Sequence, residues 1–156
     1  MPQTVAIIDF AETKVAVMEH RGDPRLIENS VRRFIEWRRK NHLPPSFSAT
    51  FNILYDDPAE VSPDKYRIGL CAAVDCEIND PEYDIVSGTI PAGRCAVLRH
   101  IGVEETLGKS IWQLCAKWLP LSGEKRSDFP IFLQRVRFFP EVPVTEAVTD
   151  IFLPIL

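Results

Sequence analysis

"FAETKVAVMEHRG", residues 10–22, is written again with few changes as "IPAGRCAVLRHIG", residues 90–102. When each residue n is set beside residue n+80, the two stretches align without a gap. The identical pairs are Ala16 with Ala96, Val17 with Val97, His20 with His100, Gly22 with Gly102 and Ser30 with Ser110. This agreement indicates that the chain contains an internal duplication.

A helix is expected after the repeated stretch in both halves. Apolar residues recur there at positions i, i+4, i+7 and i+8, which form one face of an α-helix. We expect helices over residues 24–42 and 104–118, ending before "LPP" and before Pro120, because proline cannot continue a helix. The two apolar stripes are Ile27, Val31, Phe34 and Ile35 in the first half and Leu107, Ile111, Leu114 and Cys115 in the second.

Strand patterns complete each half. The expected strands cover 4–9, 14–20, 49–55 and 66–74 in the first half and 84–90, 94–100, 129–138 and 149–155 in the second. Each half therefore reads as β-α-β-β, and two such modules can share one core, so we predict a single α+β domain over residues 1–156. The modules, about 4–76 and 83–156, are expected to be related by a pseudo-two-fold axis, with an antiparallel sheet, two main helices and a central cleft. A cleft of this kind is a preferred ligand site.

Composition and charge limit the function. The net charge of −4 argues against direct contact with nucleic acid, and "RRFIEWRRK", residues 32–40, reads as a solvated helix face. No run of eighteen apolar residues could span a membrane, and the N-terminus lacks signal-peptide features, so we expect a cytoplasmic protein. The four cysteines lack the spacing of a zinc site, and no glycine-rich phosphate cradle occurs, so we expect neither metal nor cofactor.

Several short segments, in their order and spacing, carry a resemblance to a known family. They are "VAVMEHRG" at 15–22, "YDDP" at 55–58, "IPAGRCAV" at 90–97, "WLPLSG" at 118–123 and "TDIFLPI" at 149–155. Over about residues 4–155 the chain resembles the gyrase-inhibitor-like, or AraC-type effector-binding, domain family. The resemblance implies paired β-α-β-β modules around a central pocket.

The same resemblance implies a choice of partners. Members of this family sense small molecules within transcription regulators, or stand alone as gyrase inhibitors, drug-binding proteins or hydrolases of cyclopropane-containing toxins. This chain leaves no room for a DNA-binding domain, so we expect it to stand alone or to be a fragment of a longer regulator. The implied partners are a small apolar or cationic molecule, DNA gyrase, or a DNA-binding domain in a longer chain.

The acid that the family places in its pocket is missing here. The family pattern Phe-Glu-x-Tyr aligns Phe132 with the phenylalanine and Leu133 with the glutamate, and a shift of one residue puts Gln134 there instead. Arg135 then falls on the tyrosine. Without a desolvated carboxylate, cation binding and general acid/base chemistry are both weakened. Glu19, Glu77 and Asp150 are the alternative acids.

Aromatic residues are the stronger ligand candidates because flat rings suit planar apolar molecules and cations. Phe152 stands where many members have tyrosine, Tyr55 and Tyr66 bracket the first-half loop near the equivalent of Phe138, and Trp112 lies off its helix stripe. For Phe132 and Phe152 an ordinary core position is an equal alternative. The predicted ligand-binding residues are Glu19, Tyr55, Tyr66, Trp112, Phe132, Leu133, Gln134, Phe138 and Phe152.

Other prominent side chains have structural interpretations. His20 and His100 precede glycine turns at equivalent positions, and hydrogen bonding to the turn is favoured over metal binding or proton transfer. Trp37, next to Arg38 and Arg39, is expected to be half-exposed on its helix. We predict no catalytic residue.

These observations favour a non-enzymatic binding module that holds a small apolar molecule in the cleft, with aromatic and cationic ligands both open. It would act as a stand-alone binder or as the sensor part of a transcription regulator. Two alternatives remain, a hydrolase of reactive cyclopropane-type toxins and a gyrase-interacting inhibitor protein.

Overall fold

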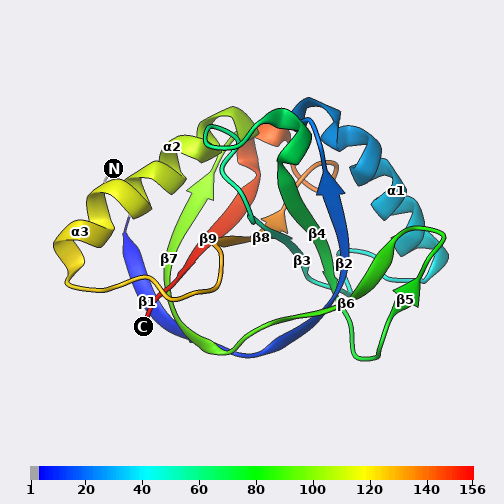
Figure 1. Cartoon of the computed structure of the whole chain (residues 1–156), viewed down its shortest axis with the longest axis horizontal. Helices are drawn as coiled ribbons and strands as arrows, with labels where there is room; N and C mark the ends of the chain where they lie inside the picture. Colours follow the sequence, from blue (N-terminus) through cyan, green and yellow to red (C-terminus); the bar gives the residue numbers. More distant parts are fainter. Residues whose placement is uncertain (1–3) are drawn as a thin grey trace. The chain divides into compact units, whose positions relative to one another are not determined.

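Antiparallel strand pairing organises the chain into two units. The computed structural model describes residues 4–156. The first-repeat unit is Thr13–Ile90, and the second-repeat unit combines Met1–Glu12 with Pro91–Leu156. Figure 1 follows the chain through both units by colour.

The first-repeat unit is a sheet with one helix on one face. Its strands lie in the order β3-β4-β2-β6-β5, and neighbouring strands are antiparallel. A short 3-10 turn, Pro24–Leu26, leads into the helix α1, Ile27–Lys40, which packs on β2 and β4 (Figure 1). The strands are β2 (Thr13–Arg21), β3 (Thr50–Ile53), β4 (Arg67–Ala73), β5 (Asn79–Asp80) and β6 (Ile85–Ile90).

The buried side of α1 differs from the predicted stripe. Ile35, which the stripe included, is 43% exposed, whereas Trp37 is 1% exposed, so both predictions were wrong. Trp37 stacks on Phe34 at 5.9 Å between ring centroids, and its Nε1 donates to Asp80 Oδ2 at 3.1 Å. Asp80 belongs to β5, so the β5–β6 hairpin brings a polar partner to a ring that a lone helix would expose.

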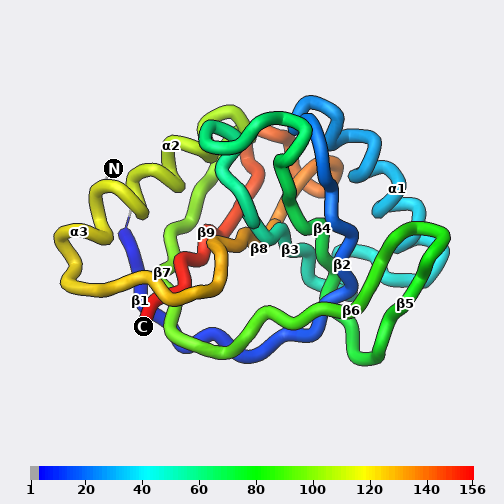
Figure 2. The backbone as a smooth tube through the Cα atoms, viewed as in Figure 1, coloured from blue at the N-terminus to red at the C-terminus, as the bar shows by residue number. Residues whose placement is uncertain are grey.

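The second-repeat unit repeats this plan with a longer helical segment. Its strands lie in the order β1-β7-β9-β8, all antiparallel. The strands are β1 (Val5–Phe10), β7 (Gly93–Ile101), β8 (Phe132–Arg137) and β9 (Val148–Pro154). A 3-10 turn (Glu104–Thr106), α2 (Leu107–Trp112), a π-helical stretch (Gln113–Trp118) and α3 (Leu119–Ser122) follow β7. Figure 2 shows these segments as one continuous coil.

The predicted end of this helix before Pro120 was wrong, because the helix runs on to Ser122 and stops at Gly123. Pro120 lies near the start of α3, just after the π-helical stretch, so the coil continues through the proline that was expected to end it. Gly123 has φ +78°, a left-handed conformation that glycine adopts readily at a helix end.

The first strand of each repeat pairs within the unit of the other repeat. β1, from the first repeat, pairs with β7, and β6, from the second repeat, pairs with β2. The modules predicted over 4–76 and 83–156 follow the sequence repeat, whereas the structural units begin and end at Thr13 and Ile90. The α+β class, the antiparallel pairing, the duplicated modules and the two main helices are confirmed.

The same histidine–serine hydrogen bond occurs in both repeats and joins each helix to its sheet. His20 Nδ1 lies 2.7 Å from Ser30 Oγ on α1, and His100 Nδ1 lies 3.0 Å from Ser110 Oγ on α2. The Nε2 atoms lie 3.1 Å and 3.2 Å from the carbonyl oxygens of Asp23 and Val103, respectively. A carbonyl can only accept, so Nε2 carries the hydrogen in both rings. The predicted structural role of both histidines at the turn is confirmed.

No helix within residues 4–156 is both long and apolar enough to cross a membrane. Over the same residues, no group of three or more histidine, cysteine, aspartate or glutamate side chains is placed to hold a metal ion.

Removing the serine hydroxyl tests the histidine–serine bond. Ser110→Ala leaves the buried Nδ1 of His100 without its partner, and we expect the free energy of unfolding to fall by about 1–3 kcal/mol. Urea unfolding followed by circular dichroism measures this change. Ser46→Ala, at an exposed position, is the control, and equal stability of the two variants would contradict the proposed role.

Candidate functional site

The sheet face opposite α1 carries the predicted site residues of the first-repeat unit. Successive side chains on a strand point to opposite faces, and directly opposed residues of an antiparallel pair share a face. His20 points to α1, so Glu19 points away from it, together with its opposed residue Gly69. Val17 and its opposed residue Cys71 lie on the same side. We call this surface the first helix-free face.

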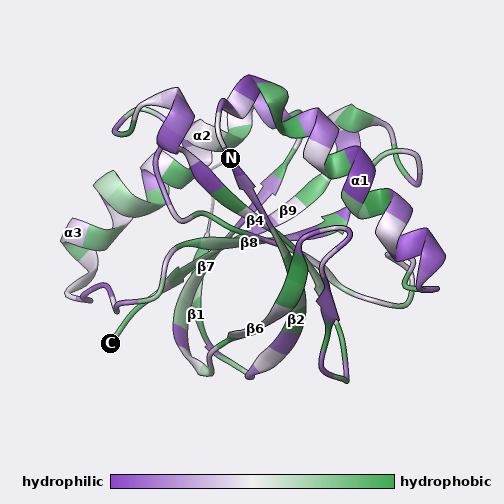
Figure 3. Ribbon diagram, turned by 45° about the vertical axis from the view of Figure 1, so that its right-hand side comes forward, coloured by the Kyte–Doolittle hydropathy of each residue, from purple (hydrophilic) through white to green (hydrophobic). Residues whose placement is uncertain are grey.

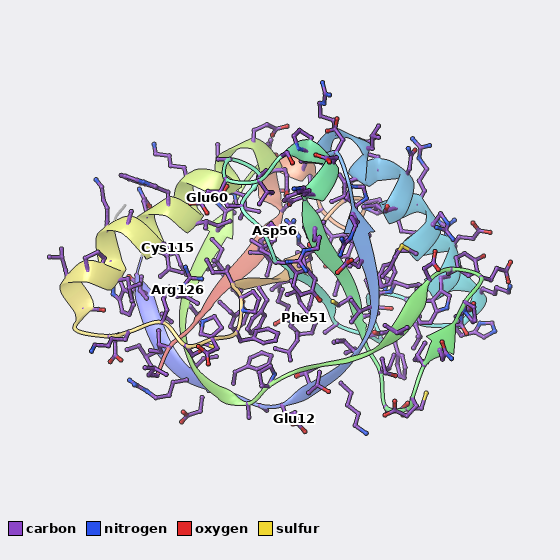
Figure 4. All side chains as sticks on the ribbon, viewed as in Figure 1. Glu12, Phe51, Asp56, Glu60, Cys115 and Arg126 are labelled. Atoms are coloured by element: carbon purple, nitrogen blue, oxygen red, sulfur yellow. The ribbon has the colours of Figure 1, made fainter. Side chains whose placement is uncertain are left out.

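Tyr55 lies flat against this face because residue 69 has no side chain. A Cβ at Gly69 would come within 3.2 Å of Tyr55 Cε2 and 3.4 Å of its hydroxyl oxygen. The guanidinium of Arg67 lies 5.5 Å from the centre of the Tyr55 ring, and its Nε donates to Asp56 Oδ2 at 3.0 Å. Figure 4 labels Phe51, which lies on β3, and Asp56, which follows that strand. Tyrosine, arginine and aspartate thus form one contiguous polar group at the end of β3.

Burial and neighbouring charge set the protonation of this group. Burial raises the pKa of Tyr55, and the charge of Glu19 raises it further, so the phenol stays protonated at neutral pH. The hydrogen bond from Arg67 lowers the pKa of Asp56. Burial raises the pKa of Cys71 to about 12. The group therefore presents a neutral phenol and thiol beside an ion pair.

The other predicted residues of this unit are engaged differently. Glu19 is bound by Arg21, whose Nη2 lies 3.3 Å from Glu19 Oε2, and both side chains are partly exposed. Tyr66 is buried at the start of β4, and burial raises its pKa, with Asp56 and Asp57 adding to the effect. Glu19 and Tyr55 thus share one face, and Tyr66 belongs to the core.

Four phenylalanine rings cluster in the second-repeat unit. Phe132 and Phe152 are parallel, 4.8 Å apart with an interplanar angle of 3°. Phe10 meets both edge-on at 5.0 and 5.4 Å, and Phe129 meets Phe132 at 6.0 Å. Phe132 is 1% exposed and Phe152 is 4% exposed, so their rings are tightly enclosed. Phe10 and Phe129, which are only partly buried, are site candidates that the sequence reasoning missed.

The two residues that were aligned with the missing acid lie on opposite faces of β8. His100 points to α2, so Arg99 and its opposed residue Asp150 point away, on what we call the second helix-free face. Gln134 opposes Asp150 and lies on that face, whereas Leu133 opposes Ile151 on the helix side and is 1% exposed. Gln134 therefore lies on the helix-free face and Leu133 lies in the core, and the alignment of either residue with the family's acid stays a prediction.

The acid beside Gln134 is already paired. Arg99 Nε and Nη2 lie 2.8 and 3.0 Å from the two carboxylate oxygens of Asp150. Glu19 of the first repeat corresponds to Arg99 of the second. The first helix-free face therefore carries an acid at the position where the second carries a base. Sequence reasoning missed Arg99 and Arg67, although comparing the aligned repeats residue by residue exposes the change from Glu19 to Arg99.

The remaining predicted residues lie elsewhere. Phe138 follows β8 and is half-buried, and its carbonyl accepts from the Val142 backbone N–H at 3.3 Å. Trp112 is 53% exposed, with the ammonium of Lys117 5.2 Å from its ring centre. The ligand-binding role of all nine residues, and the cleft in which they were placed, stay predictions.

A separate hollow of about 210 Å³ lies at one end of β2 and β6. Its lining combines an ammonium group, a carboxylate and a thiol, from Lys14, Glu77 and Cys76, with Gly88 and Thr89 on β6. Glu77 is thereby placed at this hollow.

Thiol chemistry checks the burial of the helix-free faces. Cys76 is exposed, whereas Cys71 and Cys95 are buried with pKa values raised to about 12 and about 11. Only the thiolate reacts, and a pKa of 12 leaves about one thiolate in 10⁴ at pH 8. With an aromatic disulfide reagent at pH 8 we expect Cys76 to react first and Cys71 only on unfolding. Cys76→Ser should abolish the fast phase, and peptide mapping that finds Cys71 labelled as quickly as Cys76 would contradict this.

Comparison with known proteins identifies the family. The GyrI-like small molecule binding domain matches residues 3–156. "Probable transcriptional regulator YgiV" of Escherichia coli strain K12 is 36% identical over 152 residues, which are 97% of this chain and 95% of the relative.

Solved structures share the fold at lower identity. The EcmrR C-terminal domain superposes with a TM-score of 0.76 at 16% identity, over 100% of this chain and 99% of that chain. In a DNA complex of EcmrR the TM-score is 0.80 at 17% identity, over 98% of this chain but 57% of that chain, so the present chain spans little more than half of that EcmrR chain. SAV2435 bound to tetraphenylphosphonium gives 0.56 at 10% identity, over 100% of this chain and 94% of that chain. A hydrolase from Listeria innocua gives 0.62 at 9% identity, over 97% of this chain and 91% of that chain.

The sequence resemblance is thereby confirmed over nearly the whole length. With its duplicated β-α-β-β plan and its match from residue 3 to residue 156, the chain belongs to the GyrI-like family of small-molecule-binding domains.

Proposed function

We propose that this chain binds a neutral, largely apolar aromatic molecule and serves as a small-molecule sensor. The observation that carries the proposal is that the carboxylates of the helix-free faces are paired with arginines. Glu19 pairs with Arg21, and Asp150 pairs with Arg99. Paired charges leave little net field to attract a cation, whereas aromatic rings beside them still offer apolar and stacking contacts.

Aromatic groups supply the binding surface. In the second-repeat unit, Phe10 and Phe129 are partly exposed members of the ring cluster, and the enclosed Phe132 and Phe152 hold them in place. In the first-repeat unit, Tyr55 presents a protonated hydroxyl that can donate a hydrogen bond to a neutral ligand. An uncharged planar molecule matches the rings of the second-repeat unit, and an acceptor group on a ligand matches the hydroxyl of the first-repeat unit. SAV2435, which shares the fold, is bound to the lipophilic cation tetraphenylphosphonium, so charge is the property on which we expect this chain to differ.

A role as the sensor of a transcription regulator is supported by the relatives. YgiV carries the name of a probable transcriptional regulator, and EcmrR has been solved in a complex with DNA. We propose that ligand binding here acts on a DNA-binding partner, either in the same longer chain or in a separate one. Such a partner would place the protein in the cytoplasm.

A hydrolase is the second candidate because Glu19 and Tyr55 share a face and a hydrolase from Listeria innocua shares the fold. We rank it lower. Glu19 Oε2 is already engaged by Arg21 at 3.3 Å, and the resemblance aligns the family's acid with Leu133 or Gln134, neither of which is an acid. Turnover of a cyclopropane-containing ester that is lost in both Glu19→Gln and Tyr55→Phe would reverse this ranking.

Calorimetric titration with two probes of similar shape tests the charge preference. We expect the wild-type chain to bind neutral triphenylphosphine oxide at least as tightly as cationic tetraphenylphosphonium. Arg21→Gln frees the carboxylate of Glu19, and we expect the affinity for the cation to rise by roughly 2- to 5-fold while that for the neutral probe is unchanged.

The matched control is Arg32→Gln on the exposed side of α1, where Arg32 makes a long pair with Glu28 at 3.9 Å. This variant should leave both affinities unchanged. Wild-type preference for the cation by tenfold or more would contradict the proposed selectivity, and no saturable binding of either probe would contradict the binding of this ligand class.

A further inference from the structure

The outer side of the α2–α3 segment carries an exposed tryptophan between two small residues. Trp112 is 53% exposed, and Gly108 and Ala116, four residues before and after it, are exposed too. A Cβ added at Gly108 would meet nothing within 4 Å. Figure 3 shows hydrophobic, neutral and hydrophilic colours following one another along this segment. Trp112 can therefore act as a knob in helix packing, and Gly108 and Ala116 leave room for a large side chain of another helix.

The π-helical stretch adds a charge to this side. In an α-helix, residue i+5 points well away from residue i, whereas in a π-helix the i→i+5 repeat stacks them. Lys117 therefore lies beside Trp112, with its ammonium 5.2 Å from the ring centre. Glu105, at the beginning of the segment, supplies an exposed carboxylate.

We propose that this surface, Glu105, Gly108, Trp112, Ala116 and Lys117, is a homodimer interface in which two copies of the segment pack antiparallel. The order of these residues along the helix indicates that the partner is a second copy of this chain. The midpoint between Gly108 and Trp112 is residue 110, and the midpoint between Glu105 and Lys117 is residue 111. A two-fold axis near these residues places the tryptophan over Gly108 of the partner subunit.

The same axis sets charge against opposite charge. An axis midway between the two midpoints leaves each of these pairs one residue, about 1.5 Å, out of register along the helix, so the long side chain of Lys117 reaches Glu105 of the partner subunit. Ala116 is small enough to let these side chains approach. Lys109 comes level with Trp112 of the partner subunit, where an ammonium over the ring is favourable. Glu104 is held within its own chain by Arg135, with Nη1 2.8 Å from Oε2, and does not oppose the pairing.

The size of the contact predicts how tight the dimer is. A single helix pair buries an area at the low end for specific interfaces, so the dimer should form reversibly with concentration. Trp112 at the centre, shielded from water in the complex, is the residue type that contributes most to such interfaces. This role differs from the ligand-binding role predicted for Trp112 from the sequence.

Sedimentation equilibrium across micromolar to millimolar concentrations tests the proposal. We expect the wild type to pass from one to two chain masses, and Gly108→Glu to stay monomeric because the new side chain fills the hole without touching its own chain. The control is Ile35→Glu, at a 43% exposed apolar position on α1, which should dimerise as the wild type does. A monomeric wild type at every concentration, or a Gly108→Glu variant that still dimerises normally, would overturn the proposal.

A charge exchange separates the interface from effects within one chain. Glu105→Lys and Lys117→Glu should each weaken self-association, because each puts like charges together across the axis. Mixed in equal amounts, the two variants should form a heterodimer, because both cross-axis pairs are then of opposite sign. Failure of the mixture to associate while the wild type dimerises would refute the antiparallel arrangement.

Discussion

The hydrogen bond between a strand-end histidine and a helix serine determines the layout of both units. Its donor and acceptor groups come from residues ten apart, His20 with Ser30 and His100 with Ser110, and the second ring nitrogen binds the carbonyl of the turn between them. Buried polar atoms must be paired, so the helix can lie on one face of the sheet only. The opposite face is left without a helix in each unit, and several predicted ligand-binding residues, among them Glu19, Tyr55 and Gln134, lie there.

Within this shared frame the two repeats have diverged by charge. Glu19 on one helix-free face corresponds to Arg99 on the other, and the residues opposed to them in the sheet are Gly69 and Asp150. Glycine makes room for Tyr55, whereas aspartate forms a two-pronged ion pair with Arg99. The same backbone thus supports a phenol in one unit and a neutralised ion pair in the other. Duplication supplied two surfaces that could change independently.

Sequence reasoning predicted what the repeat itself contains and missed what depends on pairing. The strands, the helices and the turn role of the histidines follow from local pattern and spacing. The pairing of β1 with β7 and of β6 with β2 does not follow from local pattern. Aligning residue n with residue n+80 gives no information on which strands are neighbours in the sheet. The buried Trp37 was missed because its partner Asp80 lies 43 residues away. Among the candidate site residues, Tyr55 and Glu19 were chosen by residue type, whereas the pairing of the acids with Arg21 and Arg99 depends on side-chain positions that the sequence does not give.

The helices of the two repeats differ in a way that the sheets do not. α1 is a regular helix, whereas its counterpart contains a π-helical stretch, and such stretches are rare and occur often at functional positions. A π turn gives up good α-helical geometry, so it persists where the altered side-chain placement is useful. Here it brings Lys117 beside an exposed tryptophan on the side away from the sheet. Ligand binding on the helix-free face of the sheet and association through the outer side of the helix would then use opposite sides of the second-repeat unit, so that neither constrains the residues of the other.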